Sequence, residues 1–198
     1  MIDQALPSAV LTLGDPRLRV PAAPVEDVTD PAFQRDVSAL TQTLLEFRER
    51  RGFGRAISAP QIGVPLRFIV LELGEGPFVL VNPEITWWSE SRFTMWDDCM
   101  SFPSLLVRVQ RHESISLRYL NEAGEECEWN NLGREESELV QHEIDHLDGI
   151  LAIDRAFGEG SLVTRTMFET VPARYLAEVD YTIPPPARSN RPPPPAGA

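Results

Sequence analysis

The chain is organised around Gln141-His-Glu-Ile-Asp-His-Leu147, in which two His flank a Glu within a predicted helix of about 134–146. Residues four apart project from the same face of a helix, so His142 and His146 can offer imidazole nitrogens to one ion. Glu143 lies beside them, where it can carry a proton. The motif therefore predicts a metal site with an adjacent acid–base group.

The composition indicates one folded domain. With 198 residues, 42% of them hydrophobic, the chain can bury a substantial core but is short for two domains. We predict a single domain over 1–183 and a disordered tail over 184–198, which is rich in Pro. The net charge of −12 disfavours nucleic acid or an anionic membrane as a partner, because either would be repelled.

Targeting and redox signals predict a cytoplasmic protein. Residues 1–13 lack the charged-then-apolar pattern of a signal peptide. No apolar run approaches the ~20 residues that span a bilayer. The two cysteines, Cys99 and Cys127, are expected to be free thiols in a reducing compartment.

Several strands and one further long helix are predicted around the motif. Asp30 and Pro31 indicate a helix start, and apolar residues at a spacing of three to four continue to Gly52. Strands are expected at 66–73, 78–81, 85–88, 107–110, 114–120 and 127–129. Pro83 is expected to end the second strand, and the last three strands are expected to form one antiparallel ladder. Short helices are expected over 155–181.

The third metal ligand is less evident than the two histidines. A catalytic metal needs a third protein ligand and an open position for water, and no His follows His146. Cys99 offers a thiolate, which binds first-row metals more strongly than a carboxylate does. The alternatives downstream of the helix are three carboxylates, Glu159, Glu169 and Glu178.

Three ordered motifs resemble those of the peptide deformylase family. They are Gly54-Arg-Ala-Ile-Ser-Ala-Pro-Gln61, Asp97-Asp-Cys-Met-Ser101 and His142-Glu-Ile-Asp-His146, similar to the family patterns GxGxAAxQ, EGCxS and HExDH. The resemblance extends over about 11–157. It implies an α+β fold with antiparallel β-sheets packed around the central metal-binding helix. It also implies a metallohydrolase that removes the formyl group from N-formylmethionine at the start of new polypeptides.

The resemblance also implies roles for individual residues. One divalent ion would be held by Cys99, His142 and His146. Fe(II) is the native ion that the resemblance favours, and Zn(II), Ni(II) or Co(II) suits the same ligands. Glu143 would take a proton from water and deliver it to the leaving amine. The Gln61 side-chain amide and the Met100 backbone N–H would stabilise the oxyanion.

A supporting network and a substrate pocket follow from the same resemblance. Asp97, Arg111 and Asp145 match charged family positions and are expected to hold the ligand segments in register, although each could instead be a solvated surface charge. The substrate's first side chain is expected to contact Gly54, Arg55, Ala56 and Ile57. His112 and Cys127 are not expected to bind the metal.

The chain departs from the family pattern near the expected pocket. Arg55 and Ala56 replace an aliphatic residue and a Gly, Asp97-Asp98 replaces Glu-Gly, and Leu106 occupies the place of an Arg. An unpaired buried guanidinium is costly, so Arg55 is expected to reach solvent or to pair with an acid such as Asp98. We therefore expect Arg55→Ile to raise kcat/KM for formyl-Met-Ala by ~10-fold.

Other functions remain compatible with these residues. The expected partner is an N-formylated peptide or nascent polypeptide, and the sequence does not predict an oligomeric state. A paralogue could act on a different N-formyl or N-acyl amine. A metal-stabilised binding protein could have kept the fold without turnover. A zinc peptidase would be favoured if a downstream Glu, rather than Cys99, bound the metal.

Overall fold

The computed structural model describes residues 9–183 and contains two antiparallel sheets. In spatial order, one sheet consists of β1 (Ala56–Ser58), β2 (Phe68–Glu72), β3 (Pro77–Trp88), β6 (Ile115–Leu120) and β7 (Glu126–Trp129). The other consists of β4 (Arg92–Asp98), β5 (Leu105–His112) and β8 (Leu162–Thr164). The predicted Pro-rich tail, 184–198, lies outside the described residues.

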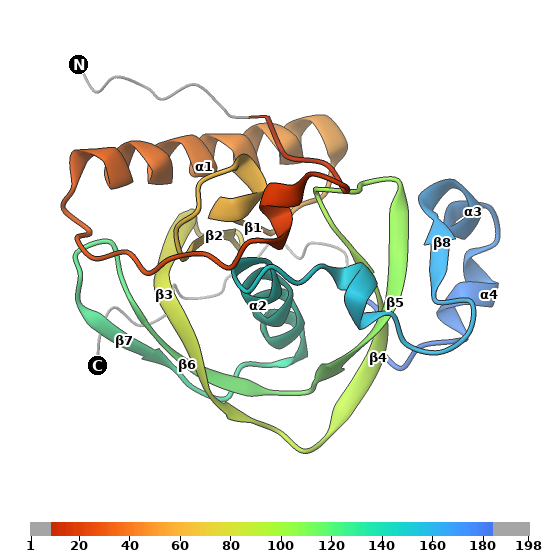
Figure 1. Cartoon of the computed structure of the whole chain (residues 1–198). Coiled ribbons are helices and arrows are strands. Elements are labelled where there is room, and N and C mark those ends of the chain that lie inside the picture. Colours follow the sequence, from red (N-terminus) through yellow and green to blue (C-terminus); the bar gives the residue numbers. More distant parts are fainter. Residues whose placement is uncertain (1–8, 184–198) are drawn as a thin grey trace.

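The metal-motif helix lies at the centre of the molecule. This helix, α2 (Arg134–Leu147), is surrounded by both sheets (Figure 1). Every residue from Ser137 to Leu147 is buried, so this part of α2 contacts protein on all sides. Gly149 follows at φ +73, and a Cβ there would lie 2.7 Å from the Arg19 carbonyl oxygen. The turn after α2 therefore requires glycine.

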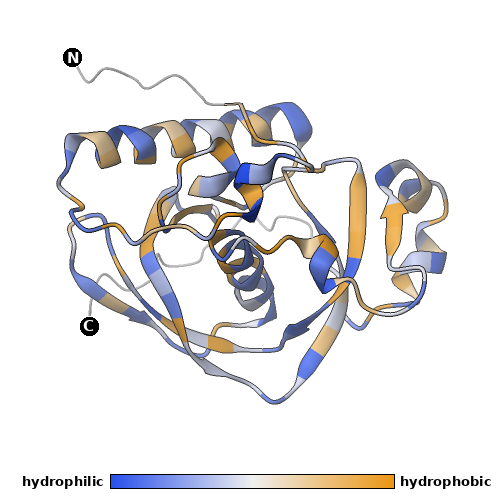
Figure 2. Ribbon diagram, viewed as in Figure 1, coloured by the Kyte–Doolittle hydropathy of each residue, from blue (hydrophilic) through white to orange (hydrophobic). Residues whose placement is uncertain are grey.

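The long helix α1 (Pro31–Arg51) begins and ends where the sequence predicts. The Asp30 side chain accepts a hydrogen bond from the Ala32 N–H, and Gly52 ends the helix in the left-handed conformation at φ 76. The helix lies across the five-stranded sheet (Figure 1), and hydrophobic and hydrophilic residues alternate along its length (Figure 2).

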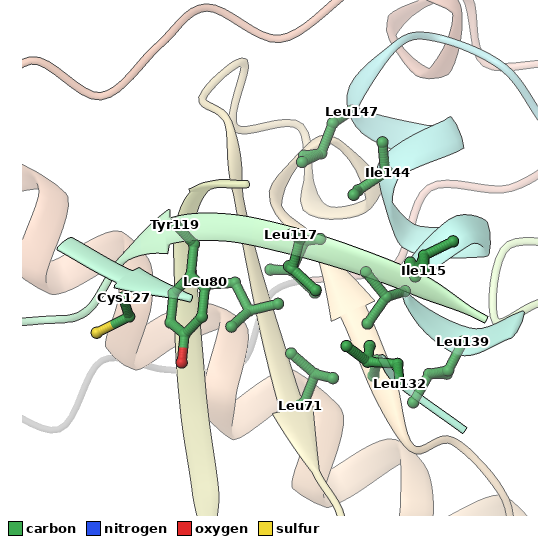
Figure 3. Close-up of a cluster of buried hydrophobic side chains, with 13 residues drawn as sticks. Leu71, Leu80, Ile115, Leu117, Tyr119, Cys127, Leu132, Leu139, Ile144 and Leu147 are labelled. Atoms are coloured by element: carbon green, nitrogen blue, oxygen red, sulfur yellow. The ribbon is translucent and has the colours of Figure 1, made fainter. Parts of the chain in front are cut away.

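β2 packs against both helices, because its side chains alternate between the two faces of the sheet. Phe68 and Val70 are buried in the cluster that contains the apolar face of α1. Ile69 and Leu71 belong to a second cluster with Leu139, Ile144 and Leu147 of α2 (Figure 3). Successive side chains of a strand point to opposite faces. The continuous apolar run of β2 is thus explained by burial on both sides.

The predicted break at Pro83 is wrong, because β3 continues through it to Trp88. Asn82 adopts a positive φ of 50°, and the pairing with β6 shifts register between Val81 and Glu84. Such a bulge accommodates a Pro that cannot donate to the ladder. The Asn82 amide is held by two hydrogen bonds to the backbone of Val25, at 2.9 and 2.8 Å.

The predicted ladder of three strands is only partly correct. β6 pairs with β7 as expected, but β5 pairs with β4 and β8 in the other sheet. The chain changes sheets between His112 and Ile115, so neighbouring strands in the sequence are separated in space. β4 was not predicted, although Phe93 and Met95 alternate with polar residues along it. It leads directly to Cys99.

The remaining elements are short. They are the 3-10 helices Pro16–Arg19, Ala59–Ile62 and Ala152–Arg155, and the helices α3 (Arg165–Thr170) and α4 (Pro172–Leu176). The last two confirm the expectation of short helices over 155–181. Among the helices of residues 9–183, none combines the length and apolar character that crossing a membrane requires.

Candidate metal centre

The structure brings Cys99, His142 and His146 together. Their candidate ligand atoms all lie within 4.8 Å of one another, and the Cys99 Sγ is 3.2 Å from the His146 Nε2. All three side chains are buried. One thiolate and two imidazoles form a ligand set that suits a divalent first-row metal and leaves a coordination position open.

The alternative ligands do not join this cluster. Among residues 9–183, the converging His, Cys, Asp and Glu side chains include none of the downstream carboxylates; Glu178, for example, accepts a hydrogen bond from Arg108 at 3.2 Å. His112 is also elsewhere, with Nδ1 2.6 Å from the Ser89 carbonyl oxygen. Cys127 is buried in the hydrophobic cluster under β6 and β7 (Figure 3).

Asp97 orients one of the two imidazoles. The His142 Nδ1 lies 2.9 Å from the Asp97 Oδ2, which leaves Nε2 for an ion. Burial lowers the pKa of His142, but the charge and hydrogen bond of Asp97 outweigh it and raise that pKa well above its usual value. Burial lowers the pKa of His146 and raises that of the Cys99 thiol. A bound cation favours the forms that coordinate, thiolate and neutral imidazole.

One buried polar atom supports the fit of a metal with its water. Glu143 Oε2 has no hydrogen-bond partner among the described residues, although Glu143 lines the cavity beside the three ligands. Buried polar atoms nearly always have a partner, so this oxygen is placed to accept a hydrogen bond from water. Together with the thiolate and imidazole ligands of the centre, it fits a divalent ion that binds water.

Glu143 and Gln61 both face this centre. Burial raises the pKa of the Glu143 carboxyl to about 7. The Gln61 Oε1 accepts a hydrogen bond from the Ser58 N–H at 3.0 Å, which directs its Nε2 toward the Cys99 Sγ, 3.7 Å away. The backbone N–H of Met100 donates no hydrogen bond within the described part of the chain. The Gln61 Nε2 also donates to the Ser101 Oγ at 3.2 Å. The Gln61 amide and Met100 both line the cavity beside the centre.

Arg111 links the two acidic residues expected to support the ligands. It is 3% exposed and donates to both Asp97, at 3.0 Å, and Asp145. Burial raises the pKa of Asp97, but His142 and Arg111 outweigh it and lower that pKa to about 2. The interpretation as solvated surface charges is therefore wrong for these residues. Sequence reasoning missed Arg155, which also donates to Asp145, at 2.7 Å.

A cavity of about 240 Å³ opens from the centre. Its lining includes Gly54, Arg55 and Ala56, as expected. The expected contact between Ile57 and the substrate is wrong, because the Ile57 side chain is fully buried in the core against α1. Because successive residues of β1 point to opposite faces, Ala56 and Ile57 cannot both face the cavity.

Arg55 pairs with an acid, as expected, but that acid is Glu138 and not Asp98. Its Nη2 contacts the Glu138 carboxylate, whereas Asp98 accepts a hydrogen bond from Arg165 at 2.7 Å. The Arg165 guanidinium also lies 4.4 Å from the centroid of the Phe53 ring. Glu138 was missed from sequence, although it precedes His142 by four residues and so shares its face of the helix.

Comparison with known proteins identifies the family. The sequence profile described as Polypeptide deformylase matches residues 7–160. The peptide deformylase of Thermotoga neapolitana is 36% identical over 146 residues, which are 74% of this chain and 85% of that protein. The chain belongs to the polypeptide deformylase family.

Solved structures agree with this assignment. The crystal structure of the peptide deformylase from Thermotoga maritima has a TM-score of 0.70 and 32% identity, covering 77% of this chain and 99% of that chain. A peptide deformylase from Synechococcus elongatus, in complex with actinonin, has a TM-score of 0.70 and 26% identity, covering 88% of each chain. The predicted α+β fold and the predicted class of enzyme, a deformylase-type metallohydrolase, are confirmed.

Proposed function

We propose that the chain hydrolyses the N-formyl amide of cytoplasmic formylated peptides or nascent polypeptides, N-formylmethionyl peptides among them, at the Cys99, His142 and His146 centre. The observation that carries this proposal is the convergence of those ligands beside a buried Glu143 and the side-chain amide of Gln61. A site that served only to stabilise the fold would normally be closed by a fourth protein ligand.

The residues around the centre divide the chemistry among them. A bound divalent ion supplies a Lewis acid that lowers the pKa of water toward neutrality. Glu143 accepts the proton of the attacking water and passes it to the amine nitrogen as the C–N bond breaks. Burial raises the pKa of the Glu143 carboxyl, which favours retention of the proton between the two steps. Gln61 Nε2 and the Met100 N–H donate to the oxygen of the former formyl group.

Formate release tests the proposed reaction. The protein, prepared anaerobically with Fe(II), should release formate from formyl-Met-Ala-Ser. Formate release should stop when a chelator removes the metal. The acetylated peptide should react much more slowly, because the added methyl group crowds the carbonyl carbon. If no formylated peptide of any sequence yielded formate, the alternative of a non-catalytic binding protein would replace this proposal.

We infer that Fe(II) is the native ion, supported by the mixed thiolate and imidazole ligands and by the family resemblance. Zn(II), Ni(II) and Co(II) suit the same ligands. Metal analysis of protein isolated without oxygen should find iron at close to one atom per chain. Predominant zinc in such a preparation would contradict the inference about iron. It would not contradict the proposed deformylation.

Asp97→Asn should weaken metal binding by ~10–100-fold, the usual effect of losing a residue that orients a ligand. The amide can still accept a hydrogen bond from His142, but it no longer stabilises positive charge on the ring and its ion. Competition with a chelator measures the affinity. Asp98→Asn is the matched control, because Asp98 contacts Arg165 instead of a ligand. Equal losses in the two variants would show that Asp97 acts only as a nearby negative charge.

A further inference from the structure

The wall of the cavity beside the ligands is built by one face of α2. Glu135, Glu138, Leu139 and His142 all line the cavity. Their spacing of three and four residues places them on the same side of the helix, one above the other. A substrate that presents its formyl group next to His142 must therefore extend its neighbouring atoms along this face or past β1 opposite.

Arg55, on the wall opposite α2, forms an ion pair across the cavity with Glu138 of α2. Arg55, just before β1, contacts the Glu138 carboxylate through Nη2 and donates from Nη1 to the Glu135 carbonyl oxygen at 3.2 Å. The Glu138 side chain is 2% exposed and that of Arg55 is 22% exposed. The ion pair is therefore largely withdrawn from solvent, and both of its residues line the cavity.

The ion pair lies in the same cavity as His142. Glu138 is four residues from His142, which corresponds to about 6 Å along the helix axis. The side chain on the carbon next to the formylated nitrogen has a reach of that order. A side chain that extended along this face of α2 would contact the Arg55–Glu138 pair.

We propose that this pocket selects a formylated first residue whose side chain is uncharged and both donates and accepts hydrogen bonds, and that it prefers glutamine to methionine. This inference rests on the proposed deformylation and names the substrate class for that site. Glutamine matches methionine closely in length, so the two differ mainly in polarity at the end of the side chain.

Hydrogen bonding favours the amide over the thioether. A side-chain amide can accept from the Arg55 guanidinium and donate to the Glu138 carboxylate at the same time. A thioether offers only a weak acceptor. When it displaces water from the exposed part of Arg55, it leaves N–H donors without a comparable partner. A site built with polar groups discriminates strongly against a substrate that cannot pair with them.

The charge of the surrounding residues disfavours charged side chains. Two acidic residues of the cavity lining are paired with arginines outside it, Asp97 with Arg111 and Asp98 with Arg165. Glu138 is the acidic residue of the lining that pairs with Arg55. A substrate carboxylate that reached Arg55 would lie beside the Glu138 carboxylate and would be repelled by it. A substrate ammonium would have to compete with Arg55 for Glu138, which is already paired. An uncharged amide is not repelled by Glu138, and it can bind both members of the pair without replacing Arg55 as the cation.

Substrate comparison provides the first test. The metal-loaded protein should hydrolyse formyl-Gln-Ala-Ser with a kcat/KM about 10-fold or more above that for formyl-Met-Ala-Ser, within the range by which pocket contacts discriminate. Formyl-norleucyl-Ala-Ser should resemble the methionine peptide, and formyl-Glu-Ala-Ser should be the poorest of the four. A wild-type preference for methionine or norleucine over glutamine overturns the inference and leaves the proposed reaction intact.

Variants show whether the ion pair is responsible. Arg55→Ile alone leaves Glu138 buried without its cation, so the gain expected from sequence for that single change should not occur. Arg55→Ile combined with Glu138→Ile removes both charges, and should reverse the preference in favour of methionine. The matched control removes an exposed pair, Arg118→Ile with Glu84→Ile, and should leave the ratio unchanged.

A binding measurement separates the pocket from the reaction. The deformylated products Gln-Ala-Ser and Met-Ala-Ser are titrated calorimetrically into wild type and into the Arg55→Ile/Glu138→Ile variant, whose folding is checked by thermal melting. Wild type should bind the glutamine peptide more tightly, and the variant should bind the methionine peptide more tightly. If no formylated peptide released formate, the proposed function would fail, yet this order of binding would still decide for or against the pocket. Equal binding of both products by wild type would overturn the pocket assignment.

Discussion

Cys99→Ala should abolish stoichiometric metal binding, the largest effect that we expect from a single substitution. The thiolate is one of three converging ligands, and two histidines one helical turn apart hold a divalent ion much more weakly than a complete set does. The methyl group of alanine should be tolerated because Cys99 is a small buried side chain among apolar neighbours. The protein should therefore remain folded while it loses its ion.

Metal analysis after gel filtration tests the role of Cys99. Cys127→Ala is the matched control, because that thiol is equally free and buried but lies in the hydrophobic cluster under β6 and β7. The control should retain one metal ion per chain. Retention of one ion per chain by Cys99→Ala would rule out the thiolate as a ligand and return attention to the carboxylates downstream of α2.

Glu143→Gln should keep the metal and lose turnover by a factor of at least ~100, since general acid–base catalysis commonly contributes 10²–10⁴-fold. Glutamine has nearly the same shape as glutamate but cannot accept the proton of water. Glu143 is 3% exposed, so bulk water does not readily replace it. The loss should therefore appear in kcat, with metal content unchanged.

Steady-state formate release with parallel metal analysis measures this effect. Glu126→Gln, an exposed carboxylate on β7, is the control for the loss of one negative charge and should keep full activity. A Glu143→Gln enzyme that hydrolysed formylated peptides at nearly the wild-type rate would make Glu143 a bystander. Another base would then have to be present near the centre.

Local patterns were sufficient to predict the parts of this protein that short-range geometry controls. The helix with His142, Glu143 and His146 follows from its own spacing, and Asp30, Pro31 and Gly52 mark the ends of α1. The hairpin of β2 and β3 was also predicted, since a turn joins two apolar runs. In each case the physical cause acts over a few residues.

The assignment of Cys99 as a ligand depended on resemblance, because its spacing from the histidines has no local meaning. The tertiary structure supplies a geometric reason: β4 ends directly before Cys99 and places it against α2. The same strand carries Asp97 to His142, 45 residues away in the sequence. Which strand lies beside the helix is decided by packing of the whole chain.

The sequence by itself predicted the metal motif, the proposed acid–base role of Glu143 and α1, and its family resemblance implied the α+β class. The tertiary structure decided which strands pair and which side chains line the cavity. β5 and β6 are neighbours in the sequence but lie in different sheets. Arg55 forms an ion pair with Glu138, 83 positions away, and not with Asp98, which accepts a hydrogen bond from Arg165. Helical spacing is a local property, but the choice among several carboxylates depends on which of them the folded chain brings within reach and leaves unpaired.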